Sequence, residues 1–319
     1  MTKKRENNVS KVIRAWWSEK CAQIGEKITL NAQTQDAANH VLDFQIYEFR
    51  RKSKIVKEIS VPVYHPEISA KWKVAYKSTI AEYGNPEFRF KAKIGNKSKT
   101  SKTLYIPATL EIALTFDDGP APKEKPRTKR ILDVLKSKRI KASFFVEHSN
   151  ILDKYRQDLL KRMTKEGHNV GIHGVDSKKH HLRHQDTPDF EDKLRAMRNL
   201  IKEITGAYPI FIRPPYGWGG WEKGGIFNKS QLRRIYSKFN MIRVNGWESE
   251  VGKKDFWLAI ERKIENAAKG NAQKLIILSH DLREYDAVNL PEIIKGIEGR
   301  VAKVKVKIKY LTLKEFYKK

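Results

Sequence analysis

The sequence contains little cysteine and no long apolar run. Cys21 is the only cysteine among 319 residues, so an intramolecular disulfide is excluded. No apolar run reaches the length of a signal peptide or a membrane-spanning helix, and residues 1–10 are polar and charged. We therefore expect no membrane span and a protein that is cytoplasmic as synthesised. The alternative is export by a route that needs no cleaved signal, which would let the protein act in the periplasm or cell wall.

Acidic residues are also few relative to basic ones. The chain carries 65 Lys and Arg against 37 Asp and Glu, a formal charge of +28. This charge favours anionic partners such as nucleic acid or an anionic glycan, although a lysine-rich solvated surface would explain it equally well. Because no arginine-rich tract or RNA-binding signature accompanies the charge, nucleic acid is the less expected partner. Hydrophobic residues make up 39%, which indicates a globular protein, and the length favours two domains.

Residues 1–107 have the pattern of an all-β domain. Apolar residues recur with a period of two in four stretches, which Gly, Asn and Pro residues separate. Several short alternating strands within about 100 residues predict a β-sandwich. The apolar positions are Ile28, Leu30 and Ala32; Leu42, Phe44 and Ile46; Ala70, Trp72, Val74 and Tyr76; and Phe88, Phe90, Ala92 and Ile94.

This stretch resembles the immunoglobulin-like modules that accompany type VI secretion spike and effector proteins. The resemblance rests on Ala15-Trp16, Gly25 to Leu30, Phe44 to Glu48 and Ala70 to Trp72. It implies a docking or accessory role and a partner in a secretion apparatus.

Residues 108–319 have the pattern of an α/β domain. Continuous apolar strands alternate with amphipathic helices such as residues 189–205 and 255–269, which predicts a parallel sheet covered by helices. About seven strand-helix repeats fit a barrel or a barrel-like sheet, in which chemistry gathers at the carboxyl ends of the strands. The expected strands cover residues 111–116, 142–146, 169–172, 210–213, 241–246, 275–279 and 304–311.

Side chains suited to metal binding or proton transfer follow five of these strands. Two adjacent carboxylates, Asp117 and Asp118, repel each other unless a cation is shared, so one can bind a metal while the other accepts a proton. Convergence of such residues at one edge of a sheet predicts a catalytic site. The residues at the five strand ends are Asp117 and Asp118, His173, Arg213, Glu248, and His280.

Three segments give the second domain a specific resemblance to a known family. Thr115 to Gly119, Arg213 to Gly217 and Leu278 to Asp281 resemble signature motifs of the polysaccharide deacetylases, the NodB-homology or carbohydrate esterase family 4 domain. The resemblance covers residues 110–319. It implies an irregular (β/α)7-type barrel that removes N-acetyl or O-acetyl groups with a divalent metal, expected to be Zn²⁺.

The resemblance also implies roles for the matching residues. Asp117 would be the general base, held in place by Arg213. Asp118 would bind the metal together with His173. One carboxylate with two imidazoles is a familiar set of three protein ligands that leaves room for water and substrate.

Two further roles follow from the same resemblance. The backbone N–H of Tyr216 would stabilise an oxyanion, since a rigid Pro-Pro segment can aim it. His280 would protonate the leaving amine, because imidazole can give a proton near neutral pH. An acid near a tryptophan would orient His280, and Glu248 and Asp255 both remain candidates.

The chain departs from the family pattern at the second metal-binding histidine. Family members usually carry His-Ser/Thr-x-x-His, but the fourth residue after His173 is Ser177. The motif has the form of a lengthened loop, so we expect His180 to be the displaced ligand, with His181 in reserve. Asp176 and His148 are weaker candidates.

These observations predict a metal-dependent hydrolase that removes acetyl groups from N-acetylated amino sugars of a glycan. Peptidoglycan is favoured because the positive charge suits an anionic wall polymer. One alternative is a small-molecule amidohydrolase of the same fold, acting on a cyclic imide or ureide. The other is a non-catalytic glycan-binding protein whose metal site has degenerated.

Overall fold

The computed structural model describes residues 10–49, 54–75, 85–176, 188–215, 227–244 and 246–318. The chain folds as two compact units, of which the first comprises Met1–Leu110, Ile264–Gln273 and Arg300–Lys307. The second comprises Glu111–Lys263, Lys274–Gly299 and Ile308–Lys319. Among the described helices, none is both long enough and apolar enough to cross a membrane.

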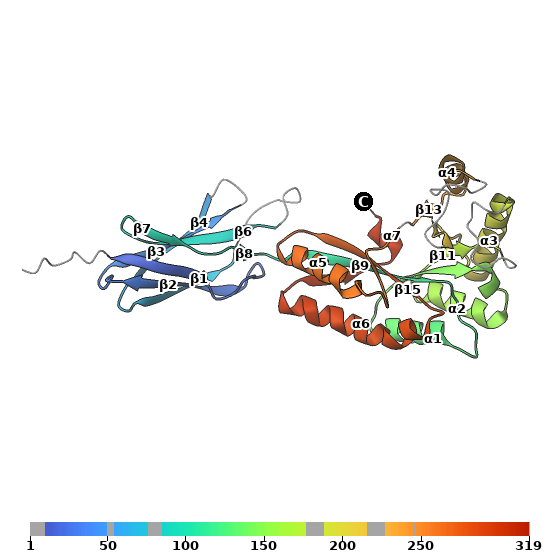
Figure 1. Ribbon diagram of the computed structural model, residues 1–319, viewed down its shortest axis with the longest axis horizontal. Coiled ribbons are helices and arrows are strands. Elements are labelled where there is room, and N and C mark those ends of the chain that lie inside the picture. Colours follow the sequence, from blue (N-terminus) through green and yellow to red (C-terminus); the bar gives the residue numbers. More distant parts are fainter. Residues whose placement is uncertain are drawn as a thin grey trace, which may run out of the picture. The chain divides into compact units, whose positions relative to one another are not determined.

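Two antiparallel sheets make up the N-terminal part of the chain (Figure 1). One sheet has the order β1-β2-β5, and the other has the order β4-β3-β6-β7 with β8 paired to β6. The strands are β1 (Lys11–Trp17), β2 (Lys27–Gln35), β3 (Val41–Glu48), β4 (Lys54–Pro62), β5 (Glu67–Lys73), β6 (Glu87–Ile94), β7 (Lys97–Thr100) and β8 (Leu104–Tyr105).

The two sheets share an aromatic core. The ring of Trp17 from β1 meets the ring of Phe90 from β6 edge-on, with centroids 4.7 Å apart. Trp72 from β5 meets Phe88 from β6 in the same way at 5.1 Å. Alternate residues of β2, β3 and β6 are buried, as their period-two pattern predicts. The all-β prediction for this part of the chain is therefore confirmed.

We predict that Phe90→Ala destabilises this core strongly. Phe90 is fully buried and touches Trp17 and Phe44, so truncation should lower the free energy of unfolding by about 3–5 kcal/mol. Phe90→Leu, which keeps more of the volume, should cost clearly less. Chemical denaturation measures both, and equal losses for the two variants would contradict the packing described.

The second unit is built on one mostly parallel sheet covered by helices (Figure 1). Its order is β13-β12-β11-β10-β9-β15-β14, with β16 beside β9. Parallel pairing joins β9 to β10, β10 to β11, β11 to β12, β12 to β13, and β14 to β15. The strands are β9 (Thr109–Asp117), β10 (Ser143–Glu147), β11 (Asn169–Gly174), β12 (Phe211–Ile212), β13 (Ile242–Arg243), β14 (Ser249–Glu250), β15 (Gln273–His280) and β16 (Lys307–Tyr310).

Seven α-helices are described, and α2 packs against β11 and α3. They are α1 (Arg127–Ser137), α2 (Lys154–Lys165), α3 (Phe190–Thr205), α4 (Lys229–Lys238), α5 (Phe256–Ala268), α6 (Glu284–Lys303) and α7 (Leu313–Phe316), and a 3-10 turn η1 (His148–Asn150) follows β10. The predicted α/β fold with a parallel sheet is confirmed. The strand expected over residues 241–246 is shorter, since β13 lies at the sheet edge with one neighbour.

Strand alternation points three polar side chains toward the same face. Ala113, Phe145 and Phe211 form one core cluster with Leu313 and Phe316 of α7. Residues two positions further along a strand, or four, lie on the same face. Asp117 on β9, Glu147 on β10 and Arg213 after β12 therefore continue this face beyond its apolar part.

Candidate functional site

The two neighbouring aspartates lie at the turn that ends β9. Asp117 is buried and Asp118 is half-buried, with Asp118 in the left-handed region at φ 79°. Asp tolerates that region better than most non-glycine residues, so the chain can turn there. Asn150 donates to the Asp118 carbonyl at 2.7 Å, and the Glu147 N–H donates to the Gly119 carbonyl at 3.1 Å. The turn is thus fixed against the end of β10.

Arg213 holds Asp117 in place. Its guanidinium donates to Asp117 Oδ1 at 2.8 Å and to Thr115 Oγ1 at 2.9 Å. The side chain is 1% exposed, and its Cζ lies 4.4 Å from the ring centroid of Phe145. A charge-assisted bond in such a dry setting is strong and fixes geometry. The structure therefore brings Arg213 and Asp117 together, as the motifs predict.

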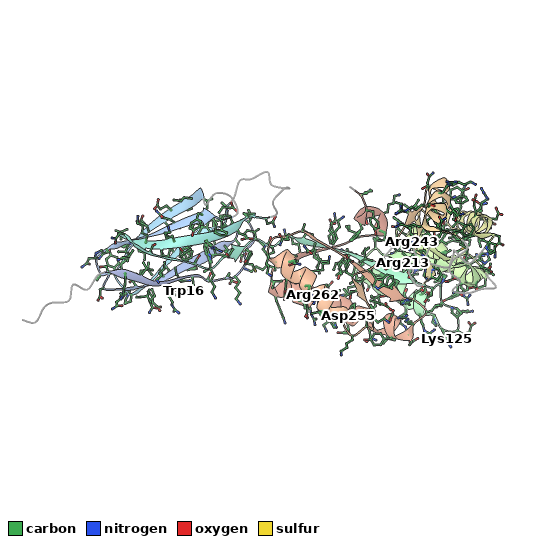
Figure 2. The ribbon with its side chains drawn as sticks, turned by 45° about the horizontal axis from the view of Figure 1, so that its top comes forward. Trp16, Lys125, Arg213, Arg243, Asp255 and Arg262 are labelled. Atoms are coloured by element: carbon green, nitrogen blue, oxygen red, sulfur yellow. The ribbon has the colours of Figure 1, made fainter. Side chains whose placement is uncertain are left out.

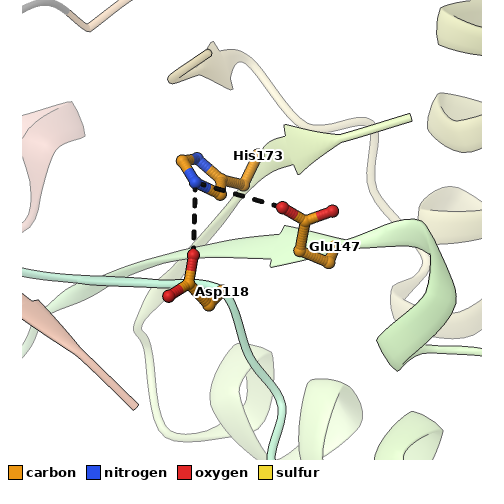
Figure 3. Close-up of side chains that lie close together, drawn as sticks. All are labelled: Asp118, Glu147 and His173. Carbon is orange, nitrogen blue, oxygen red and sulfur yellow. Dashed lines mark ion pairs between the residues drawn. The ribbon is translucent and has the colours of Figure 1, made fainter. Parts of the chain in front are cut away.

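His173 connects this pair to Asp118. Its Nδ1 lies 2.7 Å from the Arg213 carbonyl, which can only accept, so Nδ1 carries a hydrogen and donates. The other ring nitrogen, Nε2, faces Asp118 Oδ1 at 3.3 Å and Glu147 Oε1 at 4.0 Å (Figure 3). Burial lowers the pKa of His173, but the carboxylates of Asp117, Asp118 and Glu147 outweigh it and raise the pKa to about 9.

Glu147 is the functional candidate that sequence reasoning missed. It ends β10 and is fully buried, whereas the prediction for this strand end was the next residue, His148, which begins the turn η1. Burial raises the pKa of Glu147 to about 7, and the Asp118 and Asp117 charges add to this. The alternation of side chains along the strand could have identified Glu147, because it lies two positions after Phe145, on the side that faces the core.

Asp118, Glu147 and His173 could together hold a divalent metal. One ligand atom from each lies within 4.8 Å of the other two. Donors about 2.0–2.2 Å from a tetrahedral zinc are about 3.3–3.6 Å apart, so small side-chain shifts would complete the set. A metal-binding imidazole usually donates its second N–H to a carbonyl or carboxylate, as His173 does to Arg213. The residues therefore fit a metal.

His280 lies at the end of β15, the strand beside β9. Thr115 Oγ1 donates to the Ile277 carbonyl at 2.9 Å, and the Asp281 N–H donates to the Asp117 carbonyl at 3.2 Å. These contacts keep the ends of the two strands together. His280 is thus on the same edge of the sheet as the aspartates.

Asp286 is the carboxylate beside His280. It accepts from the His280 backbone N–H at 2.6 Å, and its Oδ2 lies 3.8 Å from the ring Nδ1. On the opposite side of the ring, Arg283 approaches Nε2 at 3.4 Å. Glu248, one of the two carboxylates expected here, instead accepts from the Ile276 N–H at 2.7 Å. The other expected carboxylate, Asp255, is exposed just before α5 (Figure 2).

Two weaker metal candidates lie outside the cluster. Asp176 pairs with Lys193, and His148 begins η1. The group of possible metal ligands among the described residues contains neither of them. Three further predicted residues, Tyr216, His180 and His181, lie outside the described residues. Their assigned roles stay predictions.

A further buried carboxylate, Asp281, packs against the turn at Gly119. Thr128 donates to its Oδ2 at 2.7 Å and accepts from the Ala121 N–H at 2.7 Å. Gly119 is required here because a Cβ at that position would lie 1.9 Å from Asp281 Oδ2. Burial raises the pKa of Asp281 to about 8, with smaller contributions from Asp118 and Asp117.

We predict that Asp281→Asn flattens the pH dependence of stability in the metal-free protein. The folded-state pKa of about 8 lies above the unfolded-state value of about 3.9, so the folded protein holds the extra proton between them. The stabilisation from the buried, protonated carboxyl of Asp281 is fully present below the unfolded-state pKa. It is lost progressively as the pH rises through the folded-state pKa. Thermal unfolding measured across this pH range should show a shallower decline of the unfolding temperature with pH for Asp281→Asn. The control Asp192→Asn, which changes an exposed carboxylate, should show the same decline as the unmodified protein.

Comparison with known proteins identifies the segment that carries this site. Residues 107–229 match the family described as polysaccharide deacetylase. This segment carries the similarity of the chain to polysaccharide deacetylases. The deacetylase match includes the two aspartates, Glu147, His173 and Arg213, whereas His280 and Asp286 lie beyond it.

Two curated relatives are named as peptidoglycan deacetylases. Peptidoglycan-N-acetylglucosamine deacetylase PgdA of Listeria monocytogenes is 33% identical over 147 residues, covering 42% of this chain and 30% of that protein. Peptidoglycan-N-acetylmuramic acid deacetylase PdaC of Bacillus subtilis is 31% identical over 234 residues, covering 69% and 45%. A solved family 4 carbohydrate esterase from Bacillus anthracis is 27% identical with a TM-score of 0.45, covering 66% and 84%. The chain thus spans less than half the length of these two curated relatives.

Proposed function

We propose that this protein is a metal-dependent deacetylase that removes the acetyl group from N-acetylated amino sugars of a glycan, with peptidoglycan as the favoured substrate. The observation that carries the proposal is the buried Arg213–Asp117 pair beside Asp118 and His173, all within the deacetylase match. Two relatives named as peptidoglycan deacetylases support the choice of substrate. The charge of +28 suits an anionic wall polymer.

The residues divide the work of amide hydrolysis between them. A bound divalent metal, with Zn²⁺ favoured, would lower the pKa of a coordinated water and polarise the acetyl carbonyl. Asp118 and His173 would hold it. Asp117 is proposed to accept a proton as general base, and the Arg213 guanidinium keeps its carboxylate oriented. Tyr216 is proposed to give its backbone N–H to the developing oxyanion.

His280 would complete the reaction as general acid. The leaving sugar nitrogen needs a proton, and His280 on the neighbouring strand edge can supply it. Asp286, through its bond to the His280 backbone and its position near Nδ1, would orient the ring. Asp286 thus replaces Glu248 and Asp255 in the proposed scheme.

The remaining parts of the chain have proposed roles too. We propose that the second unit is an irregular barrel of the NodB-like type, beginning near residue 108. The N-terminal sheets would form an immunoglobulin-like accessory sandwich that docks a secretion partner. Signal-independent export to the periplasm or cell wall would then give access to the glycan.

We predict that Asp117→Asn lowers the rate of acetate release by about 10²–10⁴-fold, because it removes the general base. Metal content should stay as in the unmodified protein, whereas Asp118→Asn should lose both metal and activity. The assay uses N-acetylglucosamine oligomers and peptidoglycan, with chelator and metal add-back, and thermal unfolding checks each variant.

Other outcomes of this assay would support a different function or contradict the proposed mechanism. Turnover of small cyclic amides but of no glycan would favour the small-molecule amidohydrolase. A protein that binds glycan without metal or turnover would be a binding protein. Equal activity after chelation would contradict the metal mechanism.

We predict that Asp286→Asn lowers kcat by about 10-fold. This is less than the roughly 10²–10⁴-fold that general acid catalysis contributes, because His280 itself stays in place. Asp286 is proposed to orient His280 and not to bind substrate, so KM should stay unchanged. The matched control is Asp192→Asn, which removes an exposed carboxylate on α3. A kcat equal to that of the unmodified protein would remove Asp286 from the scheme.

A further inference from the structure

The second histidine of the usual metal-binding motif is missing from this chain, which leaves the third protein ligand open. Ser177 occupies that position, and a serine hydroxyl is a poor substitute for imidazole as a zinc ligand. We propose that Glu147 is the third ligand, so that Asp118, Glu147 and His173 form a site of two carboxylates and one imidazole. This inference rests on the proposed metal-dependent function.

The position of Glu147 is the first argument. Its Oε1 lies 4.0 Å from His173 Nε2, and that nitrogen is also 3.3 Å from Asp118 Oδ1 (Figure 3). Because His173 Nδ1 donates to the Arg213 carbonyl, Nε2 is the ring atom available to a metal. Both carboxylates therefore approach the one nitrogen that can coordinate.

Rigidity is the second argument. Glu147 belongs to a buried strand, and its own N–H donates to the Gly119 carbonyl, next to Asp118. Pairing of β10 with β11 shifts by one residue between Val146 and Glu147, so Glu147 pairs with Gly174. One backbone arrangement thus fixes all three ligands, which suits a preformed site.

Space for the carboxylate is the third argument. A Cβ on Gly174 would lie 1.8 Å from Glu147 Oε2 and 2.5 Å from its Cδ. Any other residue at position 174 would displace the Glu147 side chain. The glycine therefore makes room for this carboxylate beside His173.

Charge balance is the fourth argument. Asp117, Asp118 and Glu147 bring three carboxylates together, and Arg213 and His173 are among the groups in contact with them. Burying charge is costly unless it is compensated. A divalent cation bound by Asp118 and Glu147 would neutralise both, and Arg213 would be left to balance Asp117.

The test is calorimetric titration of the chelator-treated full-length protein with Zn²⁺. Glu147→Gln, which keeps the shape of the side chain, should weaken zinc binding by about 100-fold or more, since even loss of an outer-shell partner costs about 10–100-fold. Gly174→Ala should also weaken binding, because it displaces Glu147 without changing any charge. The double variant His180→Ala/His181→Ala should bind zinc as the unmodified protein does.

Opposite results would overturn the inference. If Glu147→Gln binds zinc normally and the double histidine variant does not, a loop histidine is the ligand and the proposed deacetylase function stands. If the unmodified protein binds neither Zn²⁺, Co²⁺ nor Mn²⁺, both proposals fail. Thermal unfolding of each metal-free variant separates lost binding from lost folding, and a shifted Glu147→Gln affinity counts only with an unchanged unfolding temperature.

Discussion

Arg213 is the residue on which the geometry of the site depends, because its side chain fixes one group and its backbone carbonyl fixes another. Its guanidinium orients Asp117, and its backbone carbonyl accepts from His173 and so sets the tautomer of that ring. Both bonds are buried, where electrostatic interactions are strong and unpaired polar groups are costly. One residue at the end of a short strand thereby positions the proposed base and one proposed metal ligand.

Four carboxylates gather around the turn that ends β9, and three of them are buried. Asp117 and Asp118 lie close enough to Glu147 and Asp281 to raise the cost of ionising both of these groups. The raised pKa values of Glu147 and Asp281 express that cost. A divalent cation bound by these carboxylates would lower that cost, as the proposed metal-assisted hydrolysis requires.

Much of this site could be predicted from the sequence, because strand ends in a parallel sheet gather at one edge. Asp117, Asp118, His173 and Arg213 follow apolar strands directly, and the structure brings all four together. Glu147 was missed because the strand was expected to end at residue 146, which left Glu147 outside it, and His148 was the candidate ligand named for this strand end. Within β10, Glu147 lies two positions after Phe145 and so on the same face of the strand.

Asp286 could not be predicted in the same way. It lies on α6, six residues after His280, and reaches that histidine only because the chain turns back between β15 and the helix. No periodic pattern encodes such a turn. In the all-β part, by contrast, simple alternation predicted the buried residues of β2, β3 and β6, since each strand has one face on the core.

The most direct measurement is anomalous diffraction from crystals soaked in Zn²⁺, recorded on both sides of the zinc absorption edge. The account predicts one strong peak between His173 Nε2, Asp118 and Glu147, at about 2.0–2.2 Å from each donor. A peak coordinated by loop histidines without Glu147 would contradict the proposed ligand set. A peak distant from Asp118 and His173 would contradict the account of the site as a whole.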